Sequence, residues 1–409
     1  MIDFVRDNAR WIIGGFLLTL LSSFGQTFFI SLSASELRET FSLSHGEFAR
    51  LYMLATLASA ATLPFVGRLV DVVDVRRSVL LCMPILALAC LMMALLPTVW
   101  LLVLALFGLR LFGQGMMTHI AMTAMGRWYA TQRGRAISLV SLGHQFGEMV
   151  LPLAFTGLVA LGIGWRSVWV GCAVLLVLVG LPVAARLLAV ERTPLGEAPE
   201  RATASADWTR GRVLRDPVFW VLMVGVLAPA FIGTSLFFHQ NYMVELRGWS
   251  PVAFAGGFTV MAVVTIIAAL VAGRLIDTFG SLALLPYFLL PLAASCVVLA
   301  LGVAAWVIPA FFALLGASYG LSQTLFGALW PELYGTRHLG AIRSVTVSLM
   351  VLSTALGPAV TGTLIDRGIS LPEQLVFIAA YCLAASIVLA LAARVARRRL
   401  TVAVALPAR

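Results

Sequence analysis

The sequence predicts an all-α membrane protein with twelve transmembrane helices in two pseudo-symmetric six-helix bundles. Three observations lead to this fold class: a very apolar composition, long apolar runs between charged loops, and an internal duplication. Of the 409 residues, 61% are hydrophobic and only 11% are charged, whereas soluble proteins carry about 25% charged residues. A bilayer span needs about 20 apolar residues, and such runs form helices because lipid cannot satisfy backbone polar groups.

Loops rich in Arg, Asp, Pro and Gly divide the chain into twelve predicted helices. The only long polar stretch, residues 191–216, is a predicted cytoplasmic linker. It separates an N-terminal bundle, residues 1–190, from a C-terminal bundle with a short basic tail, residues 217–409. The predicted spans are 11–33, 46–70, 77–97, 99–126, 134–162, 165–190, 217–245, 250–276, 281–303, 305–332, 339–366 and 371–395.

The arginines predict the orientation of the chain. With both termini in the cytoplasm, 22 of the 28 basic residues, all of them Arg, fall on that side, five fall outside and Arg110 lies within a helix. This asymmetry is what the positive-inside rule requires. It also explains the net charge of +10 without a basic face for nucleic acid. The five cysteines lie in apolar runs without metal or redox spacing, so we expect packing roles and no cofactor.

An internal duplication relates the two bundles. The stretch GRLVD at residues 67–71 recurs as GRLID at 273–277, an offset of 206 residues. Pro152 and Pro358, inside the fifth and eleventh spans, share that offset. Two six-helix halves of one topology, related about an axis along the membrane normal, are typical of a class of transporters.

The motifs on this duplicated frame resemble those of the major facilitator superfamily over nearly the whole chain. The fourth helix carries RLFGQG, similar to the superfamily's Arg-x-x-x-Gly pattern. The stretch RWYATQRGRAISLVSLG, residues 127–143, looks like one common in the monocarboxylate and oxalate–formate branch. The loop signature Gly-x-x-x-Asp-(Arg/Lys)-x-Gly-(Arg/Lys)-(Arg/Lys) is matched in part by Gly67, Asp71, Arg76 and Arg77, with Val72 and Asp74 as departures.

The repeated hinge predicts a conformational latch on the cytoplasmic side. A carboxylate at Asp71 would be stabilised by the positive end of a neighbouring helix dipole and by hydrogen bonds from arginines. Such contacts hold the bundles together and must break when that side opens; a plain topological anchor is the alternative. The predicted latch residues are Gly67, Asp71, Arg76, Arg77, Gly273 and Asp277.

Charged groups inside the bilayer predict the coupling chemistry, because they are costly and usually functional. Arg110 on the fourth helix and Glu148 on the fifth lie near mid-membrane, and the short connection 127–133 makes these helices neighbours, so we expect the two side chains to pair. His144 shares the helix face of Glu148, and His119 extends the series toward the cytoplasm. Substrate that displaces Arg110 would leave the Glu148 carboxylate free to bind a proton. A static brace, and for His119 a packing role, are the alternatives.

A substrate site is predicted from polar groups on both bundles. Arg110 is the buried cation able to bind a carboxylate bidentately, while the C-terminal bundle offers neutral hydrogen-bonding groups, as small-molecule sites often do. An interhelical hydrogen bond is the alternative for each neutral group. The predicted substrate residues are Gln26, Arg110, His144, His239, Gln240, Asn241, Tyr319 and Gln323.

The resemblance implies a secondary active transporter that works by alternating access, and not an enzyme. We expect proton symport of a small organic anion such as a monocarboxylate, in a monomer of the plasma (inner) membrane with both termini cytoplasmic. The partners expected are the substrate, protons and lipid, with no nucleic acid. An exporter of amphipathic compounds is the alternative within transporters, and a membrane sensor on the same fold is the alternative outside them.

The arginine asymmetry gives a test of topology. Cysteines introduced near residue 200 should resist a membrane-impermeant thiol reagent in intact cells, because the 191–216 linker is predicted to be cytoplasmic. The measurement is labelling before and after the cells are permeabilised. Ready labelling of intact cells would reverse the orientation.

Overall fold

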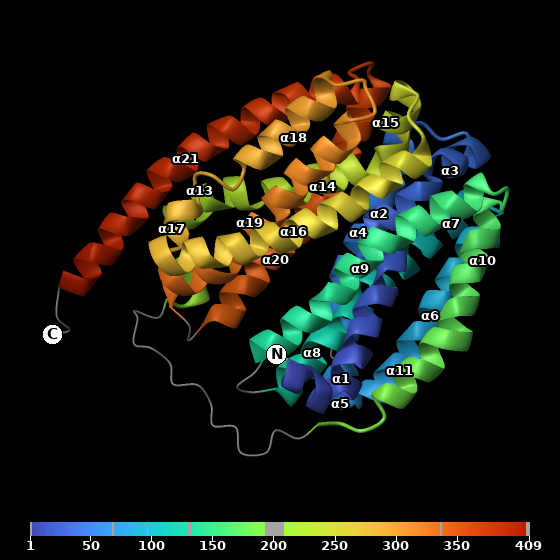
Figure 1. The fold of residues 1–409 in the computed structure, drawn as a ribbon, viewed down its shortest axis with the longest axis horizontal. Coiled ribbons are helices and arrows are strands. Elements are labelled where there is room, and N and C mark those ends of the chain that lie inside the picture. The colour runs from blue at the N-terminus through green and yellow to red at the C-terminus, as the bar shows by residue number, and fades with distance from the viewer. Residues whose placement is uncertain are drawn as a thin grey trace. The chain divides into compact units, whose positions relative to one another are not determined.

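The computed structural model describes residues 2–67, 69–95, 97–129, 133–192, 208–335 and 338–405. Most of the predicted linker therefore lies outside the described residues. The chain divides into two compact units. The N-terminal unit contains Met1–Glu200 with two later segments, Phe237–Glu245 and Ser250–Gly256. The C-terminal unit contains the rest of the chain (Figure 1).

The N-terminal unit is a bundle of long helices, two of which contain π-helical stretches. In it α1 packs along α9, and α6 packs along α10 and α7. The first span bends by 47° between Arg6–Gly25 and Thr27–Phe41. The elements are α1 Ile2–Leu21, η1 Ser22–Gly25, α2 Thr27–Ile30, η2 Ser31–Ser33, α3 Ala34–Phe41, α4 His45–Val66, α5 Leu69–Val72, α6 Val75–Leu95, α7 Val99–Gly108, the π-helix η3 Leu109–Met117, α8 Thr118–Trp128, α9 Arg133–Ala160, α10 Trp165–Leu175, the π-helix η4 Leu176–Gly180 and α11 Leu181–Leu187.

The C-terminal unit is also a helical bundle, in which α18 packs against α19 and α21, and α13 packs against α21. The start of α13 is fixed by the Asp216 carboxylate, which accepts a hydrogen bond from the backbone N–H of Val218, as N-cap residues do. The elements are α12 Arg210–Leu214, α13 Pro217–Val226, α14 Ala228–Phe238, α15 Gln240–Arg247, α16 Pro251–Phe279, α17 Ser281–Leu284, α18 Leu290–Leu301, α19 Val307–Tyr334, α20 Leu339–Asp366 and α21 Leu371–Ala405.

Helices lie in all twelve of the ranges predicted to span the membrane. Nine described helices are long and apolar enough to cross it, and the bent first span is a tenth. Two predicted spans differ. α9 has 28 residues but carries polar groups, including His144 and Glu148, in its middle, and α18 has only 12 residues because the chain preceding it forms turns. The prediction of an all-helical membrane protein is confirmed.

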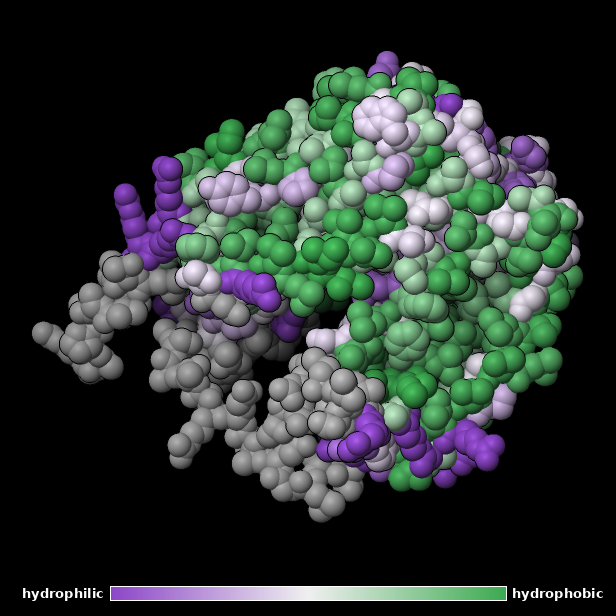
Figure 2. Space-filling model, viewed as in Figure 1, coloured by the Kyte–Doolittle hydropathy of each residue, from purple (hydrophilic) through white to green (hydrophobic). Residues whose placement is uncertain are grey.

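The surface fits a lipid environment. Large apolar side chains such as Leu178 and Phe377 are exposed on their helices, and Figure 2 shows apolar residues over the sides of the bundles. Hydrophilic residues gather near α5 and α11 in the N-terminal unit and at the end of α21 in the C-terminal unit (Figure 2). Apolar sides and polar ends are the pattern that a bilayer selects.

A backbone crossing holds the bent first span against the fourth. Gly25 ends the first half of the bent span, and Gln26 has an extended backbone, with φ −86° and ψ 151°. A Cβ added at Gly113 of η3 would lie 2.7 Å from the Gly25 Cα and 2.8 Å from its nitrogen. The two backbones are therefore in direct contact, and only glycine fits on either side. Gly113 of the RLFGQG stretch is therefore a close-packing position.

This crossing can be tested by adding one methyl group. Gly113→Ala should lower the melting temperature of the purified protein by several degrees, because overpacking costs about 1–3 kcal/mol. Gly157→Ala on α9 is the matched control, since a Cβ there meets nothing within 4 Å and alanine favours the helix by about 1 kcal/mol. Equal melting temperatures for the two variants would contradict the crossing.

Candidate functional site

The site begins with Arg110, a buried cation in the π-helix η3. Its side chain is 2% exposed. Its Nη1 donates to the Gly25 carbonyl oxygen at 3.4 Å and to the Thr27 Oγ1 at 3.3 Å. Both acceptors flank Gln26, where the first span breaks and turns a carbonyl and a hydroxyl toward the guanidinium. π-Helical turns are rare and frequently mark functional sites.

Tyr52 of α4 covers the same guanidinium. Its hydroxyl and the Thr27 Oγ1 are 2.6 Å apart, and the Arg110 Cζ lies 5.4 Å from the centroid of the Tyr52 ring. A cation near an aromatic face is stabilised by about 0.5–2 kcal/mol. Tyr52 and Thr27 are neutral, so the guanidinium is solvated by dipoles and a π face rather than by a counter-charge.

The sequence predicted an Arg110–Glu148 pair, and the structure does not form it. Among the described residues no carboxylate lies within ion-pair distance of Arg110, and its Nε has no hydrogen-bond partner. The guanidinium points instead to the break in the first span, where Gly25 and Thr27 supply its acceptors. The prediction had assigned that role to Glu148 of α9. Burying a charge without its partner costs several kcal/mol. Arg110 is therefore a cation with unused capacity to bind an anion.

Glu148 and His144 lie one turn apart on α9. Glu148 is 8% exposed, and its carboxylate makes no hydrogen bond to the described part of the chain. The His144 ring lies 6.0 Å from that of Phe28, and its buried Nδ1 has no partner. The two titratable groups are thus held in an apolar setting with open hydrogen-bonding capacity.

Two further polar groups belong to this region and were not predicted. The Ser23 Oγ and the Thr56 Oγ1 are buried without hydrogen-bond partners. Ser23 lies against Gly147 of α9, where an added Cβ would clash with its hydroxyl oxygen. Thr56 follows Tyr52 by one turn of α4. Buried polar groups are nearly always hydrogen-bonded in proteins, so unsatisfied groups on η1, α4, α9 and η3 mark a region suited to a polar ligand or water.

His119 lies apart from this group. Its Nε2 would be 3.3 Å from a Cβ at Gly67, so it packs beside the hinge between α4 and α5. The predicted extension of the titratable series from Arg110 to His119 is not formed by direct contact. Packing against the hinge is the role that the geometry gives His119.

The latch is described only in part. Asp74 caps α6, accepting from the backbone N–H of Arg77 at 2.7 Å, and its carboxylate pairs with the Arg77 guanidinium at 3.2 Å. Arg76 is exposed, and a Cβ at Gly273 would meet nothing within 4 Å. The side chains of Asp71 and Asp277 lie outside the described residues, so the latch stays a prediction. Asp74, a departure from the signature, has a local role as the helix cap.

The residues 237–245, which include three predicted substrate residues, pack within the N-terminal unit. The Gln240 Nε2 donates to the Phe28 carbonyl oxygen at 3.0 Å and to the Ser31 Oγ at 2.8 Å. The Asn241 Nδ2 donates to the Leu32 carbonyl oxygen at 3.1 Å and to the Ser35 Oγ at 3.0 Å. Both side-chain amides therefore donate to acceptors on α2, η2 and α3. These are the interhelical hydrogen bonds that were the alternative to substrate binding.

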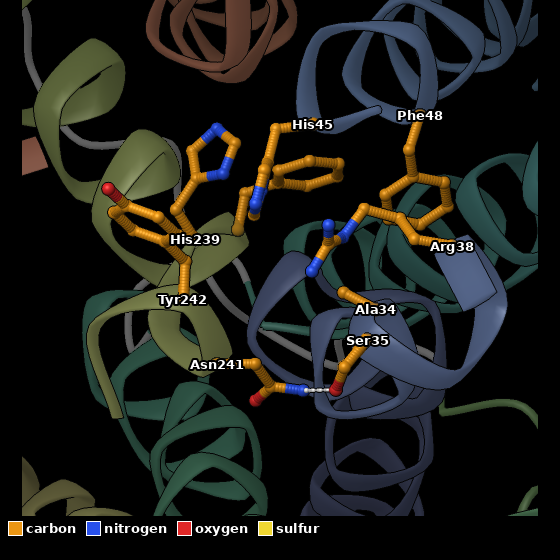
Figure 3. A pocket seen from close by; sticks show the side chains of 9 residues that line it. Ala34, Ser35, Arg38, His45, Phe48, His239, Asn241 and Tyr242 are labelled. Carbon is orange, nitrogen blue, oxygen red and sulfur yellow. Dashed lines mark hydrogen bonds between the residues drawn. The ribbon is translucent and has the colours of Figure 1, made fainter. Parts of the chain in front are cut away.

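His239 lines a small pocket beside this segment (Figure 3). The rings of His239 and His45 are 6.0 Å apart, and Tyr242 packs edge-on against His45 at 4.9 Å. The Arg38 guanidinium points toward the same space (Figure 3). The volume is about 10 Å³, enough for one water molecule and not for an organic solute.

The remaining predicted substrate residues lie in different settings. Gln26 is half-buried at the break in the first span, next to the two residues that bind Arg110. This position is compatible with its predicted role in the substrate site. Tyr319 of α19 packs its hydroxyl against Gly233 of α14, where an added Cβ would overlap it. Gln323, one turn further, is exposed. Of the predicted set, Gln26, Arg110 and His144 are therefore gathered in one region of the N-terminal unit.

A comparison with protein families identifies the chain. The model of the Major Facilitator Superfamily matches residues 15–358, which is most of the sequence. The chain belongs to the Major Facilitator Superfamily. It is therefore a multi-pass membrane transporter and not an enzyme, as the sequence predicted.

Individual relatives of this superfamily member are distant. The oxalate:formate antiporter of Oxalobacter formigenes is 27% identical over 133 residues. That stretch covers 32% of this chain and 31% of the antiporter, so the alignment spans about a third of the curated relative. It supports, loosely, the resemblance to the oxalate–formate branch.

Solved structures share the fold of this superfamily member. A bacterial homologue of the human lysosomal transporter Spinster, in an inward-facing and unoccupied conformation, has a TM-score of 0.73 at 19% identity, covering 95% of this chain and 97% of that one. Tetrameric PepTSo2 has a TM-score of 0.67 at 15% identity, covering 97% and 99%. At such identities the likeness concerns the fold alone.

Two of the three predicted substrate glutamines, Gln240 and Gln323, provide a matched test of the structure. Gln240→Leu should lower the free energy of unfolding by about 1–3 kcal/mol, because it removes the two buried hydrogen bonds that the Gln240 amide donates. Gln323→Leu should change it little, because Gln323 is exposed. Thermal unfolding of the purified variants measures both. Equal stability of the two would contradict the hydrogen bonds of Gln240.

Proposed function

We propose that this secondary transporter moves small organic anions, with Arg110 as the group that binds the substrate carboxylate. The observation that carries the proposal is the buried Arg110 guanidinium without an anionic partner among the described residues. Its Nε is free of hydrogen bonds. A carboxylate there would supply the missing counter-charge and accept paired hydrogen bonds, the geometry that guanidinium groups favour.

The neutral partners of Arg110 fit such a role. Thr27 and Tyr52 hold the guanidinium without neutralising it, so its charge remains available. In a site of low dielectric an unscreened charge attracts an anion far more strongly than in water. The antiporter from Oxalobacter formigenes, named for two organic anions, supports the same substrate class.

Proton coupling is the second part of the proposal, with Glu148 as the proton site. Glu148 is 8% exposed and makes no ion pair with the described residues. Water would reach Glu148 when the site opens, so that binding and release of its proton would follow the transport cycle. His144, one turn away, is the neighbouring group that would relay the proton.

The finer setting of the transporter is also part of this proposal. We infer a monomer in the plasma (inner) membrane. We also infer that both termini are cytoplasmic, because this orientation places 22 arginines on that side. We infer symport, in which the proton on Glu148 and the anion on Arg110 cross the membrane in the same direction. The Asp71 latch belongs to the same proposal, because a charged contact on the cytoplasmic side would close that side while the other is open.

Substrate binding can be tested with purified protein and a panel of monocarboxylates, dicarboxylates, amino acids and amphipathic amines. A carboxylate should raise the melting temperature, because a ligand that binds only the folded state stabilises it by mass action. Arg110→Gln should abolish that shift. Arg166→Gln, at an exposed arginine that stacks on Trp165, should retain it. Stabilisation by amphipathic amines alone would overturn the anion assignment and favour the exporter.

The geometry of the guanidinium gives a sharper transport prediction. Arg110→Lys should lower substrate uptake in proteoliposomes at least 10-fold although it keeps the charge, because an ammonium group cannot reproduce the guanidinium fork. Arg166→Lys is the matched control and should transport normally. Normal uptake by Arg110→Lys would mean that the charge alone suffices.

Coupling is tested separately from binding. Glu148→Gln should abolish accumulation driven by a pH gradient and leave exchange of preloaded substrate largely intact, because glutamine mimics the protonated acid. Glu39→Gln, at an exposed carboxylate of α3, is the control and should behave as the parent protein. If Glu148→Gln still accumulates substrate against its gradient, Glu148 is a structural brace and the proton site lies elsewhere.

A further inference from the structure

The C-terminal unit carries a basic groove that lies outside the site around Arg110. It has a volume of about 700 Å³ and is open to the surface. Its walls are formed by the start of α13, the preceding α12 and the end of α21. The start of α13 and the last turns of α21 lie on the same side of the C-terminal unit (Figure 1). Four arginines line it: Arg212, Arg215, Arg398 and Arg399.

One of the four arginines is already neutralised. Arg399 pairs with the buried Asp216 carboxylate at 2.8 Å, and Asp216 also accepts hydrogen bonds from the Tyr334 hydroxyl and the Val218 N–H. The Asp216 carboxylate is thereby held by three groups of the C-terminal unit itself. Among the described residues its ion pair is with Arg399, and none is formed with the other three arginines of the groove.

The other three arginines have no carboxylate partner in the described part of the chain. Arg212 stacks on the Trp208 ring with its Cζ 3.9 Å from the centroid, which orients its guanidinium without neutralising it. Arg215 and Arg398 are exposed and make no ion pair with the described residues. The groove therefore presents three uncompensated guanidinium groups around one opening.

The groove lies beside the ends of two candidate membrane spans. The membrane-spanning stretch of α13 starts at Pro217, and that of α21 ends at Arg399. About one turn further into each span, Val221 and Val395 are exposed, as lipid-facing residues are. Trp220, 47% exposed, donates from its indole to the Leu214 carbonyl oxygen. Tryptophan at a helix end is typical of the membrane interface.

We propose that this groove binds the phosphate headgroup of an anionic phospholipid. Guanidinium groups bind phosphate oxygens in pairs, and basic pockets between helices at the membrane surface are suited to anionic headgroups. The exposed apolar residues of α13 and α21 directly below the groove would contact the acyl chains. A soluble anion would use the arginines but not this apolar continuation, which is why a lipid is the occupant that fits.

The test compares anionic and zwitterionic lipid on the full-length protein. Phosphatidylglycerol and phosphatidylcholine are titrated separately into the detergent-solubilised protein, and bound lipid is counted by native mass spectrometry. The protein should retain phosphatidylglycerol preferentially. The triple variant Arg212→Gln/Arg215→Gln/Arg398→Gln should bind it on the order of 100-fold more weakly, from the attraction of three basic residues.

A matched control separates the groove from net charge. Arg6→Gln/Arg186→Gln/Arg343→Gln removes three other exposed arginines and should keep the preference for phosphatidylglycerol. Single substitutions of Arg215 and Arg398 serve if the triple variant fails to fold, and each should weaken binding several-fold.

Three results would overturn the proposal. The first is equal retention of the two lipids by the parent protein. The second is a preference for phosphatidylglycerol that survives the groove substitutions. The third is competition by inorganic phosphate at millimolar concentration that removes the bound lipid, which would make the groove a site for free anions.

Discussion

A buried guanidinium without a counter-charge is the constraint around which the N-terminal unit is arranged. Arg110 is 2% exposed, and a buried charge is costly unless hydrogen-bond acceptors surround it. The first span breaks at Gln26 so that the Gly25 carbonyl and the Thr27 hydroxyl face the guanidinium. The break in turn requires the glycine crossing with η3, because two backbones must touch there. The bend in the first span, the π-helix η3 and the glycine crossing thus act together to place acceptors around the Arg110 guanidinium.

The same arrangement leaves the polar groups of α4 and α9 unsatisfied. The Thr56 Oγ1 and the His144 Nδ1 are buried without partners, and Glu148 faces the same apolar surroundings. Each is a cost that a purely structural core would avoid by using apolar residues. Their occurrence in one region, beside an uncompensated cation, is the physical reason to regard that region as a transport site rather than a packed core.

Tyr52 joins this site to the segment 237–245. Its hydroxyl contacts Thr27 and its ring packs against that of Phe238, with centroids 4.7 Å apart. Ser31, one turn after Thr27, donates to the Phe237 carbonyl oxygen at 2.6 Å and accepts from Gln240. Arg110 and this segment therefore share contacts with Tyr52 and with the broken first span.

The sequence by itself determined the membrane class and the ranges in which helices lie, because apolar runs are local features. It also predicted the burial of Arg110 and Glu148, because charges within such runs are rare. It did not determine the partners of those charges. The predicted Arg110–Glu148 pair followed from helix adjacency, whereas a break of one residue at Gln26 gave Arg110 other acceptors. Ser23 and Thr56 were not predicted because small hydroxyl residues are common in helices. Gln240 and Asn241 were predicted to face substrate, yet packing gave their amides carbonyl and hydroxyl acceptors. The position of a residue within an apolar run predicts its depth in the membrane. The direction of its side chain depends on the neighbouring helices, which only the tertiary structure shows.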